Sequence, residues 1–252
     1  MMRTIVISGG ASAIGRAVAV AFRARGCHVI TVDGSKADVV ADLAVQAGRD
    51  NALRKIKELT NGRVDSVIVS AQTATGDPGT ILGLNFFAAT QLVEGLRSLL
   101  VTGPAPRVVL VSCEAILQPH DLAIIDACLA KDEYEARSAA ASAPEFAYAS
   151  SKLALSYWVK QQAVSHQWSG AGIILNAVAP GVEGTKTPPV TDSEESRAAP
   201  DRTPPTRIGR SPQPNELAAL IVFLASPENS HIIGQTIFCD GGAEAALRPH
   251  HV

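Results

Sequence analysis

The regular alternation of short apolar runs with longer segments of helical period is the feature that most restricts the fold of this chain. RTIVIS (3–8), HVITVD (28–33) and VDSVIVS (64–70) are rich in β-branched residues, and the segments between them carry apolar residues at helical spacing. A strand, helix, strand order implies parallel pairing, and strands that are apolar at almost every position are buried on both faces. The sequence therefore predicts an α/β fold of the Rossmann type, a doubly wound parallel sheet covered by helices, as a single domain over residues 1–252.

The same alternation continues to the C-terminal end of the chain. No internal repeat and no shift in composition marks a second domain. Further strands are expected at 107–112, 172–179 and 235–242, and helices at 13–26, 52–62, 81–100, 148–168 and 215–226.

Two segments interrupt this rhythm. Residues 114–147 are too long for an ordinary connection and contain an apparent helix, DLAIIDACLAKDEYEARSAA (121–140). Residues 182–214 hold seven of the fifteen prolines and show little periodicity. Long loops in compact domains are usually lids or binding segments. We therefore expect an extra helical insert at 114–147, before the helix that begins near residue 148, and a substrate-lid loop at 182–214.

The composition excludes several classes of protein. With 22 basic against 24 acidic residues the formal charge is −2, and no basic run is present to follow a phosphate backbone, so we expect no nucleic-acid partner. No apolar stretch approaches the roughly 20 residues that span a bilayer, and MMRTIVISGG lacks the pattern of a signal peptide, so no membrane association is expected. Four cysteines without a CxxC pair suit free thiols in a reducing compartment, which predicts a cytoplasmic protein. The six histidines lack metal-ligand spacing, and no metal is expected.

A glycine-rich turn, SGGASAIG (8–15), lies at the first junction between strand and helix. Gly9, Ala13 and Gly15 let the backbone turn sharply and approach a pyrophosphate, which the amide groups and positive end of the following helix would stabilise. Such a turn alone can also be an ordinary loop. Asp33, at the end of the second strand, is placed to bind ribose hydroxyls and to repel a 2′-phosphate, which favours NAD over NADP. The alternative is that Asp33 only forms a turn with the glycine that follows it.

A second motif, AYASSK (147–152), places Tyr148 and Lys152 four residues apart and so on one face of a helix. A free phenol titrates near pH ~10, and a neighbouring ammonium lowers its pKa by ~2–3 units because it stabilises the phenolate. The pair therefore predicts a tyrosine that transfers protons near neutral pH. The spacing also occurs in purely structural amphipathic helices, and it becomes specific only together with the glycine-rich turn.

These motifs resemble those of the short-chain dehydrogenase/reductase family over essentially the full length of the chain. Besides the two motifs above, the matching stretches are VDG (32–34), ADL (41–43), LNFFAAT (84–90), NAVAPG (176–181) and CDGG (239–242). Within the family the chain is most similar to the bacterial 3α-hydroxysteroid dehydrogenase/carbonyl reductase group. That similarity lies in ADVVADLAVQAGR (37–49), in the long insert before the tyrosine and in the ending DGGAEAALRP (240–249).

The resemblance implies a role for each matching position. Tyr148 would donate a proton to a carbonyl oxygen in reduction and accept one from an alcohol in oxidation, while NAD exchanges hydride with the carbon. Lys152 would hold the nicotinamide ribose and lower the pKa of Tyr148, and Asn85 would steady a water that relays protons to Lys152. Asn85 could instead begin a helix, and Asp42 could cap the next one. The implied cofactor-binding residues are Gly9, Ser12, Ala13, Ile14 and Gly15 at the pyrophosphate, Asp33 at the adenosine ribose, Asp42 and Leu43 at the adenine, Ala71 and Gln72 beside the cofactor ribose, Tyr148 and Lys152, and Pro180, Val182 and Thr185 at the nicotinamide.

Three positions depart from the family pattern. Ala13 replaces a usual loop glycine at small cost, whereas Gln72 replaces a glycine that normally lets the cofactor ribose come close, so its side chain could crowd NAD. Cys113 aligns with the catalytic serine, and because successive strand residues point to opposite faces, Ser112 cannot face the same side. A thiol is a weaker donor than a hydroxyl, and losing one well-aimed donor to an oxyanion costs ~2.7–4 kcal/mol, so reduced activity is expected. A strand end shifted by one residue would give the role to Ser112.

The sequence as a whole favours an NAD-dependent oxidoreductase that interconverts a secondary alcohol and a ketone on a hydrophobic substrate such as a steroid, bound by the insert and the proline-rich loop. The alternative is a dinucleotide-binding homologue with weak or no catalytic activity, supported by Ala13, Gln72 and Cys113 but opposed by Tyr148 and Lys152. A sugar-nucleotide epimerase is disfavoured, because such relatives usually show a GxxGxxG loop and a longer C-terminal substrate domain. Since the insert could cover the surface beside the tyrosine helix, we expect a homodimer through the C-terminal elements.

Overall fold

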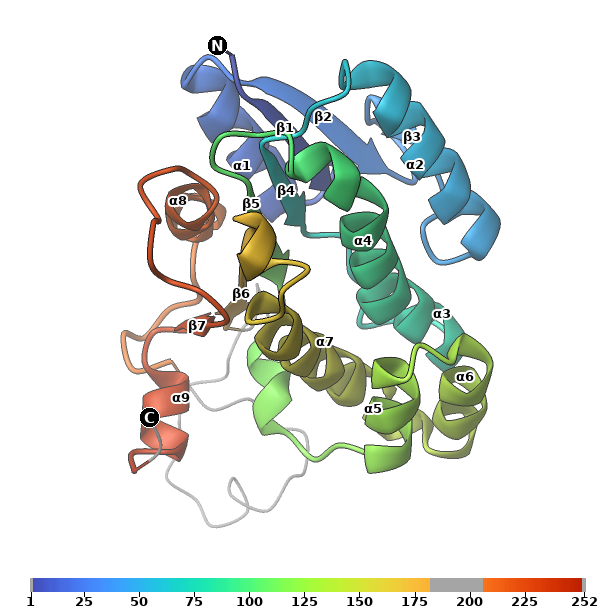
Figure 1. Ribbon diagram of the computed structural model, residues 1–252. Coiled ribbons are helices and arrows are strands. Elements are labelled where there is room, and N and C mark those ends of the chain that lie inside the picture. The colour runs from blue at the N-terminus through green and yellow to red at the C-terminus, as the bar shows by residue number, and fades with distance from the viewer. Residues whose placement is uncertain (1, 182–205, 251–252) are drawn as a thin grey trace.

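The computed structural model describes residues 2–181 and 206–250, and its centre is a parallel β-sheet (Figure 1). Within the described residues the sheet has seven strands in the order β3-β2-β1-β4-β5-β6-β7, and every neighbouring pair is parallel. The chain builds outward from β1 to β3 and then from β4 to β7, so the order reverses between β1 and β4. The prediction of a Rossmann-type doubly wound sheet is confirmed. The strands are β1 (Thr4–Ser8), β2 (His28–Asp33), β3 (Val39–Val40), β4 (Ser66–Val69), β5 (Arg107–Val111), β6 (Ile174–Pro180) and β7 (Thr236–Cys239).

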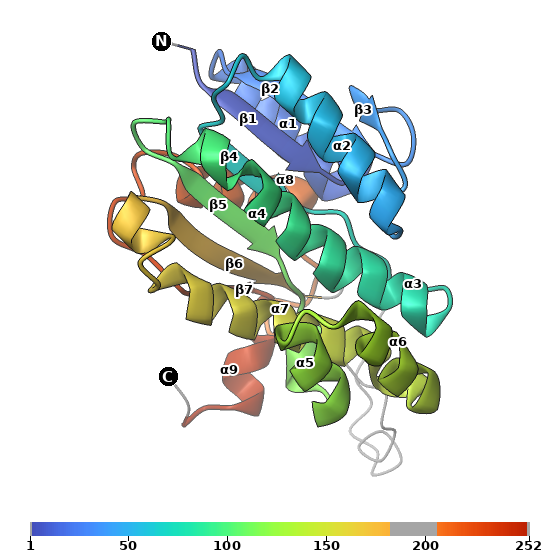
Figure 2. The same ribbon diagram turned by 45° about the vertical axis from the view of Figure 1, so that its right-hand side comes forward.

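Helices cover both faces of the sheet. α1 and α8 pack on one face, and α2, α4 and α7 pack on the other (Figures 1 and 2). No helix in residues 2–181 or 206–250 is long and apolar enough to cross a membrane. The helices are α1 (Ala13–Ala24), α2 (Gln46–Leu59), α3 (Pro78–Leu82), α4 (Ala89–Leu100), α5 (Leu122–Leu129), α6 (Glu133–Ser142), α7 (Ala147–Ala163), α8 (Pro214–Leu224) and α9 (Ala243–Leu247).

Alternating side chains of each strand enter two separate cores. Along β5, Val108 and Leu110 join the core under α2, α4 and α7, whereas Val109 and Val111 join the core under α1 and α8. This period of two is that of a strand covered on both faces. It also fixes the directions of the residues that follow β5, which border the functional site.

The insert contains two helices, so the prediction of one helix over 121–140 is wrong. α5 ends at Leu129, and α6 begins at Glu133. Lys131 between them has φ 61°, a left-handed conformation that stops a helix. Asp132 then caps α6 by accepting a hydrogen bond from the Glu135 amide at 3.0 Å. An aspartate three residues before a glutamate is the local signal for this helix start.

Three other helices differ from their predicted ranges. α2 begins at Gln46 rather than near residue 52. The predicted helix over 81–100 is interrupted by a π-helical turn at Gly83–Ala88, between α3 and α4. α7 ends at Ala163, and Trp168 instead folds back onto Trp158, with ring centroids 6.0 Å apart and an edge-to-face geometry.

Candidate active site

A large cavity lies at the carboxyl ends of the central strands. Its volume is about 980 Å³, within the range typical of ligand sites. Doubly wound sheets bind ligands at this edge, beside the point where the strand order reverses. The segments that line the cavity are the turn after β1 (Gly9, Ala11, Ser12, Ile14), the end of β2 (Asp33, Gly34), residues Ala41, Asp42 and Leu43, the segment after β4 (Ser70, Ala71, Gln72, Thr73, Ala74), Leu84, the segment after β5 (Ser112, Cys113, Glu114, Ala115, Gln118), Glu145, Tyr148, Ala149, Pro180 and Gly181.

Most of the residues that the sequence assigns to a cofactor or to catalysis border this cavity. Ala13, Gly15, Asn85 and Lys152 are not among its lining residues. Val182 and Thr185 lie outside the described residues. The residues that do line it are Gly9, Ser12, Ile14, Asp33, Asp42, Leu43, Ala71, Gln72, Cys113, Tyr148 and Pro180.

The glycine-rich turn is packed so closely that side chains could not be added. A Cβ at Gly15 would lie 2.1 Å from the Gly9 carbonyl oxygen, and one at Gly9 would lie 2.5 Å from the Ala71 amide nitrogen. Gly9 also has φ 72°, which favours glycine. Ser12 caps α1 by accepting a hydrogen bond from the Gly15 amide at 2.9 Å. The turn therefore brings backbone amides and the positive end of α1 to the cavity, which fits a bound pyrophosphate.

The end of β2 supplies a fixed carboxylate. Asp33 Oδ2 accepts a hydrogen bond from the Ala11 amide at 2.9 Å, and Oδ1 accepts one from the Gly34 amide at 2.7 Å. These bonds hold the carboxylate at the edge of the glycine-rich turn. Each oxygen can still accept a further bond, such as one from a ribose hydroxyl.

Beyond Asp33 the cavity is closed by Asp42 and Leu43. Asp42 Oδ1 accepts a hydrogen bond from the Ala44 amide at 3.0 Å, and the N-cap position of α2 is Val45, so Asp42 does not cap α2. A Cβ at Gly48 would lie 1.7 Å from the Asp42 carbonyl oxygen. Gly48 is thus required for the path of this segment, and periodicity in the sequence gives no sign of that contact.

Tyr148 and Lys152 come from the first turns of α7. Tyr148 is half-buried and borders the cavity. Lys152 is buried, and its Nζ donates hydrogen bonds to Gln72 Oε1 at 2.5 Å and to the Val111 carbonyl at 3.2 Å. Burial lowers the pKa of Lys152 to about 8, and the nearby Cys113 thiol acts in the opposite direction. Gln72 therefore accepts one of the hydrogen bonds that the ammonium can donate.

Ser112 and Cys113 both border the cavity, but they differ in burial and in polar contacts. Ser112 is buried, and its hydroxyl shares a hydrogen bond with Ser156 Oγ at 2.9 Å and donates to the Lys152 carbonyl at 3.2 Å. Its hydroxyl is thus used in packing β5 against α7. Cys113 is partly exposed, borders the cavity and lies near enough to Lys152 to affect its pKa.

Asn85 uses its whole side chain to hold a neighbouring loop. Its Nδ2 donates to the Thr73 carbonyl at 2.9 Å and to Ser151 Oγ at 3.1 Å, while Oδ1 accepts from the Thr73 amide at 2.9 Å. Asn85 lies within the π-helical turn, a feature often found at functional sites. The side chain thus ties the segment after β4 to α7.

The insert contributes to the cavity only through its ends. Glu114, Ala115, Gln118 and Glu145 border the cavity, whereas the described residues of α5 and α6 do not. Sequence reasoning missed Glu114, a buried acidic residue directly after Cys113. Its position beside the predicted catalytic residue, in an otherwise apolar stretch, was the available signal. No group of three or more metal-ligating side chains occurs in the described ranges.

The chain is similar in sequence and structure to known oxidoreductases. A family model described as Enoyl-(Acyl carrier protein) reductase matches residues 131–244. The 3-alpha-hydroxysteroid dehydrogenase/carbonyl reductase of Comamonas testosteroni is 33% identical over 262 residues, which cover 98% of this chain and 99% of that protein. The coniferyl-alcohol dehydrogenase of a Pseudomonas species is 28% identical over 254 residues, which cover 95% of this chain and 96% of that protein. The solved structure of the 3-alpha-hydroxysteroid dehydrogenase from Pseudomonas sp. B-0831, complexed with NADH, has a TM-score of 0.86 at 31% identity and covers 99% of this chain and 100% of that one.

The two sequence relatives align with 98% and 95% of this chain, and the solved structure matches its fold over 99% of the chain. The relatives are dehydrogenases and reductases that act on CH–OH groups. The chain therefore belongs to the short-chain dehydrogenase/reductase family of nicotinamide-dinucleotide-dependent oxidoreductases.

Proposed function

We propose that this protein is an NAD-dependent oxidoreductase that interconverts a secondary alcohol and a ketone, with steroids as the first substrate class to test. The observation that carries the proposal is one cavity that is lined both by the glycine-rich turn after β1 and by Tyr148, with Lys152 one turn further along α7. The similarity to a hydroxysteroid dehydrogenase/carbonyl reductase supports the substrate class. The four free cysteines support a cytoplasmic location, where thiols stay reduced.

The ends of the cavity suggest how a dinucleotide would lie. A pyrophosphate at the start of α1 has the Tyr148 end on one side and Asp33, Asp42 and Leu43 on the other. Proton transfer belongs beside the nicotinamide, so the opposite end would hold adenosine. The residues present fit that group, because Asp33 can accept from ribose hydroxyls and Leu43 offers an apolar wall.

NAD, when bound, would supply or accept the hydride. The hydroxyl of Tyr148 would donate a proton to the carbonyl oxygen in reduction and would accept a proton from the alcohol in oxidation. Lys152, in its ammonium form, stabilises the phenolate and so favours proton transfer near neutral pH. The Cys113 thiol would face the same oxygen as a weak donor. Leu84, Ala115 and Ala149 provide apolar surface beside these groups, which suits a hydrophobic substrate.

The preference for NAD rests on Asp33. Its carboxylate would lie beside the 2′-oxygen of the adenosine ribose and would repel a phosphate there. The related structure that contains NADH is consistent with this choice. We expect NAD to bind at least about tenfold more tightly than NADP, a difference of ~1.4 kcal/mol, in calorimetric titrations of the two. Equal or tighter binding of NADP would refute the assignment of Asp33.

The catalytic part of the proposal is tested with Tyr148→Phe. This change should abolish turnover of steroid and simple ketones with NADH while the affinity for NAD stays nearly unchanged, because the hydroxyl acts on the substrate. Lys152→Ala should impair both turnover and NAD binding, since that side chain serves ribose and phenol alike. Undiminished turnover by the Tyr148→Phe variant would refute the proposed role of Tyr148 in proton transfer.

A second candidate function is dinucleotide binding with weak or no catalysis. The hydrogen bond from Lys152 to Gln72 favours it, because the lysine must leave or share that partner before it can serve a ribose. Two results together would identify this alternative. The wild-type protein would bind NAD without detectable turnover of any ketone or alcohol, and the Tyr148→Phe variant would behave identically.

A further inference from the structure

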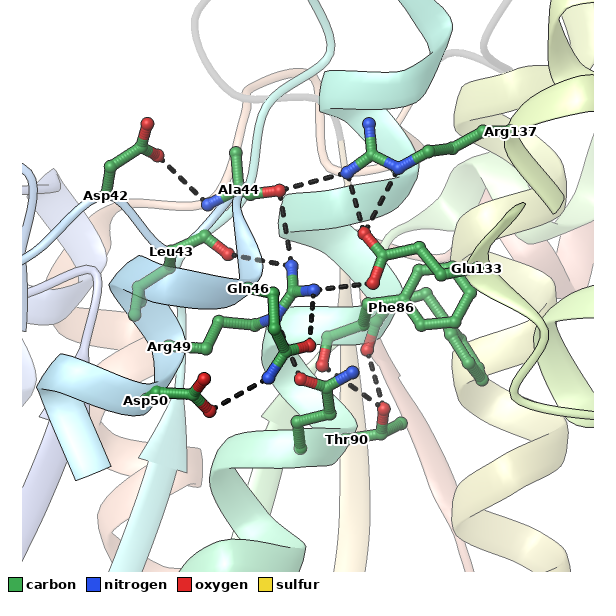
Figure 3. Close-up of polar contacts among 12 residues, drawn as sticks. Asp42, Leu43, Ala44, Gln46, Arg49, Asp50, Phe86, Thr90, Glu133 and Arg137 are labelled. Carbon is green, nitrogen blue, oxygen red and sulfur yellow. Dashed lines mark hydrogen bonds and ion pairs between the residues drawn. The ribbon is translucent and has the colours of Figure 1, made fainter. Parts of the chain in front are cut away.

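A buried arginine links the insert to the wall of the cofactor cavity. Arg49 on α2 is almost fully buried. Its Nη1 donates to the carbonyls of Leu43 at 3.3 Å and Ala44 at 3.2 Å, and its Nη2 forms a 2.5 Å ion pair with Glu133 Oε2 of α6 (Figure 3). Nε donates to Gln91 Oε1 at 2.8 Å, so the guanidinium is bonded on every side.

Glu133 also binds a second guanidinium, that of Arg137, which lies on the same helix. Its Oε1 accepts from Arg137 Nε at 3.1 Å and Nη2 at 2.7 Å, and Arg137 Nη2 donates in turn to the Ala44 carbonyl at 3.1 Å. As Figure 3 shows, both arginines point toward the backbone of Leu43 and Ala44, with the glutamate between them. One carboxylate therefore bridges two cations that both donate to the Ala44 carbonyl.

The region around Arg137 has no spare room. A Cβ at Gly83 would lie 2.4 Å from the Ala44 carbonyl oxygen and 2.7 Å from Arg137 Nη2, and a Cβ at Gly79 would lie 2.7 Å from Arg137 Nη1. α3 and the π-helical turn thus press the arginine against Ala44. The segment that closes the cavity beyond Asp33 is fixed from outside by residues of the insert.

We infer that Glu133 is a positioning residue for the adenosine end of the cofactor, and that the insert braces the backbone of Leu43, which lines the pocket, and of Ala44 next to it. The inference rests on the proposed binding of a dinucleotide. Both oxygens of Glu133 accept from guanidinium groups, so an amide in its place must turn its NH₂ toward one of them. The two cations would then repel each other across the Ala44 carbonyl, and the wall would shift.

The test is Glu133→Gln, with Glu135→Gln as the matched control. Glu135 lies on the same helix and allows the same change from glutamate to glutamine. It is exposed, and its side chain is outside the set of bonds that joins Arg49, Glu133 and Arg137. Calorimetric titration with AMP and with NAD should show affinities weaker by about fivefold or more for Glu133→Gln, a coupling of usual size between linked sites. Glu135→Gln should match the wild type. The KM for NAD should rise by the same factor with kcat nearly unchanged, because binding alone is affected.

A merely structural role would give a different result. It would lower the fraction of active protein, seen as reduced binding stoichiometry and reduced kcat, while the affinity of the folded molecules for AMP stayed the same. That outcome overturns the inference. If Glu133→Gln does not fold, Arg137→Met tests the inference instead. Arg137 is about one-third exposed, and its loss removes the bonds that its guanidinium makes to Glu133 and to Ala44. A folded Arg137→Met protein with wild-type affinity for AMP would also overturn the inference. A wild-type protein that fails to bind NAD would instead contradict the proposed function on which the inference rests.

Discussion

At the scale of single residues, two polar side chains follow β5 and border the cavity, those of Ser112 and Cys113. Ser112 continues the alternation that places Val108 and Leu110 on the α7 side, and its hydroxyl is bonded to Ser156 there. Cys113 follows and borders the cavity. If Cys113 meets the substrate oxygen as proposed, its thiol is a weaker donor to the developing negative charge than a hydroxyl would be.

Cys113→Ser should accordingly raise kcat, by about tenfold or more, since each decade corresponds to ~1.4 kcal/mol of transition-state stabilisation. The measurement is steady-state reduction of a ketone by NADH. Ser112→Ala serves as the comparison and should alter kcat little, although it leaves Ser156 with one partner fewer. An inactive Ser112→Ala enzyme beside a neutral Cys113→Ser enzyme would assign the role to Ser112.

Lys152 should leave a signature in the pH dependence of stability. Its pKa is lowered from 10.5 to about 8 by burial, and the acceptors that the ammonium finds among the described residues, Gln72 and Val111, are neutral. Between these pH values the unfolded chain binds a proton that the folded chain lacks, so stability rises with pH. We expect Lys152 to contribute a gain of ~3 kcal/mol to the free energy of unfolding from about pH 8 to 10.5, measured by urea denaturation as the difference between the wild type and Lys152→Met.

Lys152→Met isolates this contribution, because the variant lacks the titrating group and should not show the rise. The subtraction is necessary since burial raises the pKa of Cys128 to about 12, which makes stability fall with pH over the upper part of the same window. Parallel stability profiles for wild type and Lys152→Met would show that the lysine keeps an ordinary pKa in the folded chain.

At the scale of elements, local signals account for most of the fold and for few of its contacts. The alternation of apolar runs predicted six of the seven strands of the described sheet but not β3, which is two residues long, and the glycine-rich turn marked the start of α1. These features act within a few residues. Arg49 and Glu133 are 84 residues apart in the chain, and no residue near either of them in the sequence predicts their ion pair. The Gln72 bond to Lys152 is similarly remote, although the unusual glutamine itself was visible.

The break in the insert is one element boundary that capping chemistry explains, and it yields a prediction. Asp132→Ala removes the side chain that accepts from the Glu135 amide at the start of α6. The change should cost ~1 kcal/mol of stability, as is usual for an aspartate N-cap. Asp126→Ala, at an exposed position within α5, should be nearly neutral. Equal effects of the two substitutions on the urea midpoint would show that the cap does not stabilise α6.

At the scale of the whole molecule, the insert occupies one face that could otherwise meet a second copy. α5 packs on α6 and on α7, the helix that carries Tyr148 (Figure 2). Across the molecule, β7 is an edge strand of the described sheet. Near it α8 and α9 expose large apolar side chains, Phe223 at 38% and Leu247 at 51%. An open strand edge with apolar neighbours is a natural surface for pairing.

We therefore propose a homodimer formed through these C-terminal elements, and we expect a species of twice the chain mass in sedimentation at micromolar concentration. Phe223→Arg should shift it toward monomer, because a guanidinium would be buried without a partner in the contact. Tyr134→Arg, at a more exposed aromatic on α6, makes the same kind of change on the insert and should leave the dimer intact. A tetramer, or a dimer broken by Tyr134→Arg and not by Phe223→Arg, would mean that the copies meet through the insert, and the C-terminal surface would then need another explanation.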